Sequence, residues 1–183
     1  MPTGAALLIS NYRGHRRAIA FSFLGAFLAT YLAYLTTGLG FALGSTMPWL
    51  DQELIGPFVL SHYIYAAVVI GLPGLFANST IVYAVAVLTR DQRISYAAIV
   101  ALLVLYSVAS AILGQLEYRT LAVLVDPTGS AALGEAIQYW TIFERNSQLV
   151  PLEGGLLHNR VIWIAIGVGM LALTYWRFHF ETS

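Results

Sequence analysis

Cysteine and lysine are both absent from the chain. Without cysteine the protein has no disulfide, no thiol catalysis and no thiolate metal site. Charge is also scarce, since only 10% of the 183 residues are charged and nine arginines balance nine acids, which leaves no net field to recruit nucleic acid. The four histidines, His15, His62, His158 and His179, do not have the spacing of a metal site, and no nucleotide-binding glycine loop or hydrolase motif is present. The sequence therefore predicts no catalytic residue, no metal and no cofactor, and ATP energy would have to come from another chain.

Hydrophobic residues make up 58% of the chain, and the mean hydropathy is +0.74. A helix needs about 20 apolar residues to cross the roughly 30 Å of a bilayer core. Four stretches meet this requirement: residues 18–45, 58–89, 94–114 and 161–176. The first is too long for a signal-peptide core and is followed by no cleavage site, so we expect it to be retained. The sequence predicts an all-α, polytopic protein with a single transmembrane domain over residues 1–183.

The arginines indicate which side of the membrane each connection faces. Arginines are enriched in short cytoplasmic segments, and one assignment of sides gathers six of the nine in such segments: Arg13, Arg16, Arg17, Arg90, Arg93 and Arg177. Seven of the nine acids then fall on the opposite side. We therefore expect both termini to be cytoplasmic.

The segment 115–159 between the last two stretches is too apolar for a plain loop. Asp126 and Pro127 have the pattern of an N-cap followed by proline at the first helical position, which predicts a helix running to about Asn146. Within it, one stripe recurs at helical spacing: Leu133, Ala136, Ile137 and Trp140. We expect an amphipathic helix that lies on the outer membrane surface or dips into it.

The second apolar stretch is interrupted near its middle. Gly71, Pro73 and Gly74 lie inside it, and Pro73 cannot donate a hydrogen bond to the carbonyl of Val69, which predicts a kink. The polar residues Asn78, Ser79 and Thr80 follow within two turns. Two interpretations remain open. In one, these residues form a hinge and line a transport path. In the other, Ser79 and Thr80 bond to their own helix and Asn78 bonds a neighbouring helix.

Small residues recur at four-residue spacing in the first stretch: Gly25, Ala29 and Ala33, then Gly40 and Gly44. Such residues let another helix approach closely, either within a packed bundle or across a homo-oligomer interface. The four apolar cores, as bounded above, contain no charged residue. This argues against a proton-coupled carrier or a voltage sensor and leaves a bulky or amphipathic substrate, or a structural role.

Several strings resemble a bacterial ABC exporter permease, in particular the membrane part of large proteins that join such a permease to a zinc aminopeptidase. These strings are Phe23-Leu24-Gly25-Ala26, Gly44 to Asp51 with Gly56-Pro57-Phe58, Leu116 to Leu121 with Glu117 and Arg119, Asp126-Pro127, Tyr139-Trp140-Thr141 with Glu144-Arg145-Asn146, and Asn159-Arg160 with Trp163. The similarity covers residues 22–181 in order.

The resemblance implies six transmembrane helices, of which this chain has the last four, with short outer helices between the fifth and sixth. It implies a bacterial inner-membrane export system in which two permease units pair above an ABC ATPase subunit. The first two helices of the family, its coupling segment and the peptidase with its zinc ligands have no counterpart here. The chain is then a truncated product, half of a split permease, or a fragment.

Two other functions remain open on the sequence. The chain could be a structural or regulatory membrane protein, or a permease remnant, that binds other helices through its glycine stripe and transports nothing. Alternatively, it could be an enzyme acting at the outer face through Glu117, Glu144 and His158. The sequence identifies neither the substrate nor the partner genes.

Overall fold

A computed structural model gives the fold. It describes residues 4–48 and 58–177, with the side chains of residues 20–48, 58–115 and 117–177. The predicted strings around Trp49 and Gly56 lie outside these ranges, as do the side chains of Arg13, Arg16 and Arg17. Within the described part the chain is all-helical, as the sequence predicted.

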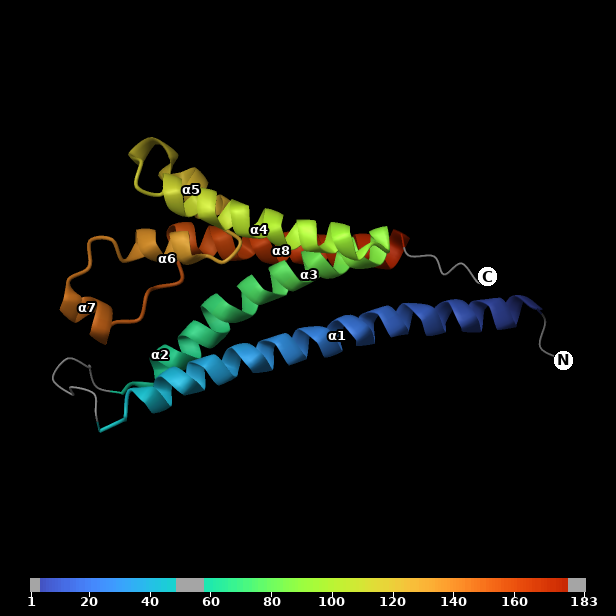
Figure 1. Cartoon of the computed structure of the whole chain (residues 1–183), viewed down its shortest axis with the longest axis horizontal. Helices are drawn as coiled ribbons and strands as arrows, with labels where there is room; N and C mark the ends of the chain where they lie inside the picture. Colours follow the sequence, from blue (N-terminus) through green and yellow to red (C-terminus); the bar gives the residue numbers. More distant parts are fainter. Residues whose placement is uncertain (1–3, 49–57, 178–183) are drawn as a thin grey trace.

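Among the described residues, four helical segments are long and apolar enough to cross a membrane, which confirms the predicted number. They are the Ala20–Gly44 part of α1 (Gly4–Gly44), the run Leu60–Thr89, α4 (Gln92–Ile112) and α8 (Gly154–Arg177). The run Leu60–Thr89 consists of α2 (Leu60–Tyr65), the π-helix η1 (Ala66–Gly71) and α3 (Leu72–Thr89). The start of α1, the α3–α4 turn and the end of α8 lie at one end of the molecule (Figure 1).

A tight turn makes α3 and α4 an antiparallel hairpin. Arg90 ends α3 in the left-handed conformation (φ 54°), and its N–H donates to the carbonyl oxygen of Ala86. Asp91 then caps α4, because its carboxylate accepts the N–H of Arg93 at 2.8 Å. The short polar sequence Arg90 to Arg93 therefore holds both the end of one helix and the start of the next.

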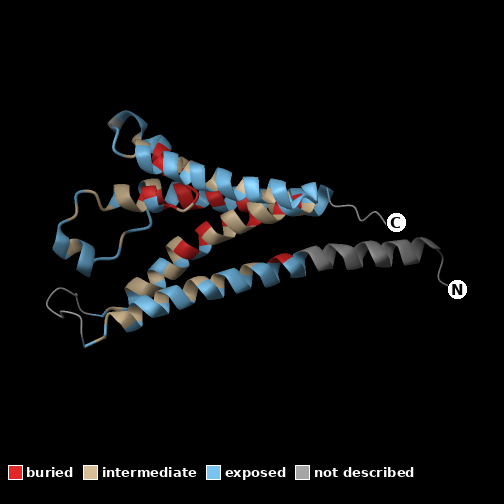
Figure 2. Ribbon diagram, in the orientation of Figure 1, coloured by how far each residue is buried: buried red, intermediate tan, exposed pale blue. Residues whose placement is uncertain are grey.

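The densest packing joins α3 to α8, and the buried residues gather on these two helices and on the short helices beside them (Figure 2). A Cβ on Gly167 would lie 2.8 Å from Phe76 and 2.9 Å from the Thr80 hydroxyl, so only glycine permits this approach. By contrast, α1 is largely exposed and contacts α3 through rings: Phe23 packs edge-on against Phe76 and Tyr83.

The segment between α4 and α8 differs from its prediction. It contains η2 (Leu116–Tyr118), α5 (Arg119–Val125), α6 (Ser130–Ala136) and α7 (Ile142–Ser147) in place of one long helix. Asp126 is not an N-cap followed by a helical Pro127. It ends α5, and α6 begins after Gly129, whose φ of 82° interrupts the helix. The apolar stripe from Leu133 to Trp140 is therefore split by the end of α6.

The start of the last helix was also predicted wrongly. Helix α8 begins at Gly154, not Val161, and so includes Asn159 and Arg160. The predicted apolar core of this helix contained no charged residue, but the observed span-length segment includes Arg160, which is only 3% exposed. The polar side chains beside it explain how such a residue is accommodated.

Candidate functional site: a buried arginine at the helix interruption

A group of buried polar side chains lies within the mainly apolar core, and its main member is Arg160 on α8. Its Nε donates to the side-chain oxygen of Asn159 at 3.0 Å, and its Nη2 donates to the same oxygen. Its Nη1 donates to the backbone carbonyl of Ile70 at 3.1 Å. A guanidinium has five donors in a rigid fork, so it can hold two acceptors on different elements at once.

The carbonyl of Ile70 belongs to the interruption of the second apolar helix. In η1 the backbone bonds reach one residue further than in an α-helix, as shown by the N–H of Leu72, which donates to Ala67. Pro73 follows and has no N–H to donate. The interruption therefore falls where the glycine and proline pattern predicted it, and Arg160 supplies a hydrogen bond to a carbonyl within it.

Asn159 links Arg160 to the loop between α5 and α6. It is fully buried, and its Nδ2 donates to the carbonyl of Asp126 at 2.9 Å and to that of Val123. Trp163, one turn later, donates to the carbonyl of Leu124 at 3.0 Å. These bonds satisfy carbonyls that the end of α5 leaves unpaired, which is a general requirement of a buried helix terminus.

Asp126 is fully buried, and its carboxylate organises the loop that covers Arg160. One oxygen accepts the N–H of Thr128 at 2.8 Å and its hydroxyl at 2.7 Å, and the other accepts the Ser130 hydroxyl at 3.0 Å and the N–H of Ala131 at 2.7 Å. Four donors satisfy this buried anion, as burial requires. The carboxylate thus caps α6 from upstream.

Two glycines allow the loop and the interrupted helix to close on Arg160. A Cβ on Gly129 would lie 1.7 Å from Nη2 of Arg160, and one on Gly74 would lie 3.2 Å from the carbonyl oxygen of Thr128. Gly71, on the other side of the interruption, receives the ring of Tyr34: a Cβ there would lie 2.3 Å from its Cε1. The junction between Ile70 and Gly71 is therefore contacted from α8 and from α1.

The structure thus brings together two sets of residues that the sequence analysis identified separately. Gly71, Pro73 and Gly74 meet Asn159 and Arg160 at one buried centre. Thr80 is buried nearby and donates to the carbonyl of Ala77 in its own helix, which agrees with the packing interpretation for this residue. Asn78 fits neither interpretation fully, since its side-chain oxygen is buried and accepts no hydrogen bond from the described residues. Ser79 is half-buried.

The remaining predicted residues lie elsewhere. At the start of α7, the N-cap residue Thr141 and Glu144 form a reciprocal capping box, and the bonds from the Thr141 backbone and hydroxyl lower the pKa of Glu144. Arg145 donates to the carbonyl of Ile137 at 3.2 Å, while Trp140 and Arg119 are half-buried. Glu117 and Asn146 are exposed.

The small residues of α1 lie apart from the buried centre. Gly25, Ala29 and Gly40 are exposed, whereas Gly44 is half-buried. No atom lies within 4 Å of a Cβ built on Gly25, Gly40 or Gly44.

Several important groups were missed from the sequence. The carbonyl of Ile70 carries no sequence signal, because any residue there would present it. The string Asp126-Pro127-Thr128-Gly129-Ser130 does carry one: aspartate, threonine, glycine and serine in this order are typical of side-chain-capped turns. Comparison with protein families, curated proteins and solved structures found no match for this chain, so no relative assigns a role to these side chains.

Proposed function

We propose that the chain is a membrane-spanning permease subunit of an ABC-type export system, which forms part of the translocation path and is driven by a separate ATPase. Four span-length helices and a buried arginine beside an interrupted helix support this proposal. The sequence resemblance to exporter permeases supports it independently. In this account the chain lies in a bacterial inner membrane, crosses it four times and has both termini in the cytoplasm.

The observation that carries the proposal is the hydrogen bond from Arg160 to the carbonyl of Ile70. Polar groups within an apolar span are costly, and in transporters they lie at sites that bind or move. A π-segment is also typical of functional sites in helices. Here the irregular backbone separates α2 from α3, so that the outer part of this span can change its angle while α3 stays packed on α8.

Transport in this account proceeds by alternating exposure of a path between two permease units. The faces available to a second unit and to lipid are on α1 and α4, whose exposed residues include Leu28, Leu32, Val100, Leu103 and Val104. The short outer helices would lie at the membrane surface, with Tyr139, Ile142 and Phe143, all more than 75% exposed, as interfacial contacts. The bilayer and an ABC ATPase are the required partners, and nucleic acid is not one of them.

The test is affinity purification of the tagged chain from native membranes after mild crosslinking. We expect an ATP-binding subunit to copurify, and its ATPase activity to depend on the presence of this chain. An Arg160→Met variant that is still inserted should keep the ATPase bound but lose the coupled activity. Absence of any nucleotide-binding subunit from material that retains its lipids would contradict the proposal.

One observation favours the alternative of a non-transporting structural protein. Gly25, Gly40 and Gly44 meet no atom of the chain within 4 Å, although the spacing of small residues suits close helix packing. Under this alternative, Gly40→Leu combined with Gly44→Leu abolishes association between copies or with another membrane protein. The transport proposal expects the same variant to change export as well, so an unchanged export phenotype would favour the alternative.

A further inference from the structure

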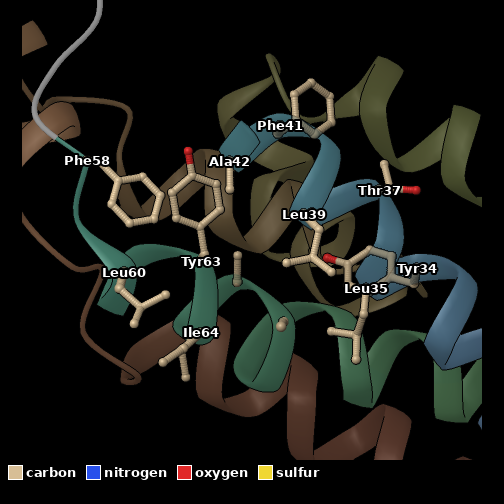
Figure 3. A pocket seen from close by; sticks show the side chains of 13 residues that line it. Tyr34, Leu35, Thr37, Leu39, Phe41, Ala42, Phe58, Leu60, Tyr63 and Ile64 are labelled. Atoms are coloured by element: carbon tan, nitrogen blue, oxygen red, sulfur yellow. The ribbon is translucent and has the colours of Figure 1, made fainter. Parts of the chain in front are cut away.

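A pocket of about 580 Å³ lies between the end of α1 and the α2–η1 segment (Figure 3). Its walls are apolar and aromatic, with Tyr34, Leu39 and Phe41 on one side and Leu60, Tyr63 and Ile64 on the other. No charged side chain is among the described residues that line it. The volume lies within the roughly 300–1,000 Å³ typical of small-molecule sites.

The pocket is closed at its inner end. The rings of Phe23, Phe27, Tyr31 and Tyr34 follow one another along α1 with centroids 5.9, 6.1 and 6.3 Å apart. The last of them, Tyr34, rests on Gly71, and the hydroxyl of Tyr31 donates to the carbonyl of Ala67 at 3.2 Å. From Tyr31 toward the N-terminus of α1, the rings of Phe27 and Phe23 contact rings on α3. The pocket therefore does not continue between these helices.

This shape selects the kind of occupant. A transmembrane helix of another subunit must run past the pocket along about 30 Å of span, and the contact between α1 and α3 blocks that route. A flexible hydrocarbon chain can lie in an apolar pocket that is blocked at one end by the Tyr34–Gly71 contact, and it needs no hydrogen bonds there. The end of α1 and helix α2, which line the pocket, lie at the opposite end of the molecule from the α3–α4 turn (Figure 1), so in a bilayer the pocket is near one leaflet only.

We infer that this pocket binds one hydrocarbon chain of an amphipathic molecule, which is the apolar part of the substrate that the permease moves. The assignment of this molecule as substrate rests on the proposed function. The pocket also has a structural connection to the buried centre. One wall is the α2–η1 segment, which ends at the Ile70–Gly71 junction held by Arg160 and Tyr34. A change in the angle of that segment would therefore open or close the pocket.

Photolabelling of the full chain in vesicles of phosphatidylethanolamine and phosphatidylglycerol tests the inference. One arm contains a phospholipid with a diazirine on its acyl chain, and the other a free fatty acid with the same group, so that the two sources of a hydrocarbon chain are distinguished. We expect adducts in peptides 34–42 and 58–67, above the labelling of the exposed face of α4, in at least one arm.

A matched pair of variants separates the pocket from ordinary lipid contact. A Cβ on Gly38, which lines the pocket, meets no atom within 4 Å, and the same holds for Gly169 on the exposed face of α8. Gly38→Phe should fill the pocket and remove its labelling, whereas Gly169→Phe should leave it unchanged. Ala42→Phe serves the same purpose if Gly38→Phe does not insert. The inference would be overturned if the pocket peptides were labelled no more than α4, and if Gly38→Phe did not change their labelling.

The labelling assay needs no ATPase, so its failure is distinguishable from failure of the proposed function. Copurification of an ATPase without pocket labelling would leave the transport role standing and remove the pocket as its site. Pocket labelling without an associated ATPase would confirm the binding of a hydrocarbon chain and overturn its assignment as a transport substrate.

Discussion

Nη1 of Arg160 lies 3.1 Å from the carbonyl oxygen of Ile70, a residue 90 positions earlier in the chain. This bond joins the last span-length helix to the only π-segment among the described residues. The same guanidinium also donates to Asn159, which in turn donates to the carbonyls at the end of α5, so two adjacent side chains of α8 link it to η1 and to α5. The account therefore predicts that changes at this centre affect elements far apart in the sequence.

Arg160→Lys should destabilise the protein by about 2 kcal/mol, because an ammonium cannot reproduce a fork that binds Asn159 and Ile70 together. The measurement is thermal unfolding in detergent, followed by circular dichroism. Arg93→Lys is the matched control: Arg93 is exposed and bonds the Asp91 carboxylate through its backbone N–H, which lysine retains, so the change should be within about 0.5 kcal/mol. Equal stability of the two variants would mean that the buried fork contributes nothing.

Gly129→Ala should destabilise the protein by at least about 2 kcal/mol, since it combines a left-handed backbone with a methyl group placed 1.7 Å from Nη2 of Arg160. Gly134→Ala is the matched comparison, because Gly134 lies inside α6, the helix that follows Gly129. Its Cβ would meet Leu113 at an ordinary 3.5 Å, so helix propensity should make it neutral or slightly stabilising. Chemical denaturation of both variants in mixed micelles gives the two values, and a tolerated Gly129→Ala would show that the loop does not close on Arg160.

The contact of Tyr34 with Gly71 predicts strong coupling between the two positions. Gly71→Ala should cost about 1–3 kcal/mol, because its Cβ would overlap the Tyr34 ring. Combining it with Tyr34→Ala should cost less than the sum of the single changes, and a double-mutant cycle measures this difference. Gly25→Ala, which meets no atom within 4 Å, should be neutral or favourable. Additive effects at positions 34 and 71 would argue against the contact.

Acid should weaken the start of α7. The backbone N–H of Thr141 and its hydroxyl donate to the Glu144 carboxylate and hold its pKa below the ordinary value. A lowered folded-state pKa means that the cap stabilises α7 fully above the unfolded value of about 4.3 and is lost as the pH falls through the folded value. A carbon-detected NMR titration measures this, and Thr141→Ala should return the pKa of Glu144 toward its ordinary range. An unchanged value in this variant would show that the capping box is not formed.

The sequence predicted the parts of the fold that are determined by hydrophobicity alone. In a bilayer, apolar runs of this length can pair their backbone groups internally as helices, so the four span-length helices and the Arg90 turn were predicted, the second and third helices with nearly their observed bounds. The interruption before Pro73 was also predicted, because a missing N–H acts locally. The start of α8 was not, since glycines and polar residues interrupt the apolar pattern of residues 154–160, and the bond from Asn159 to the end of α5 has no local sequence signal.

The candidate site was only half predictable for the same reason. Gly71, Pro73 and Gly74 were identified by backbone chemistry, and Asn159 and Arg160 by resemblance, but nothing local indicated that the two sets meet. The continuous helix expected from Asp126 failed because Gly129 adopts a positive φ and Thr141 starts a new helix with its own capping box. Both turns depend on side-chain hydrogen bonds that compete with helix continuation.

The proposed function requires that the chain crosses a bilayer with the Arg90 turn and the short helices α5 to α7 on opposite sides. Because the protein has no cysteine, Gln92→Cys and Asn146→Cys each introduce one reactive group, and both positions are exposed. A membrane-impermeant maleimide applied to intact spheroplasts should label position 146 and leave position 92 unlabelled, and inverted vesicles should give the reverse. Labelling of both positions from the same side would contradict the account.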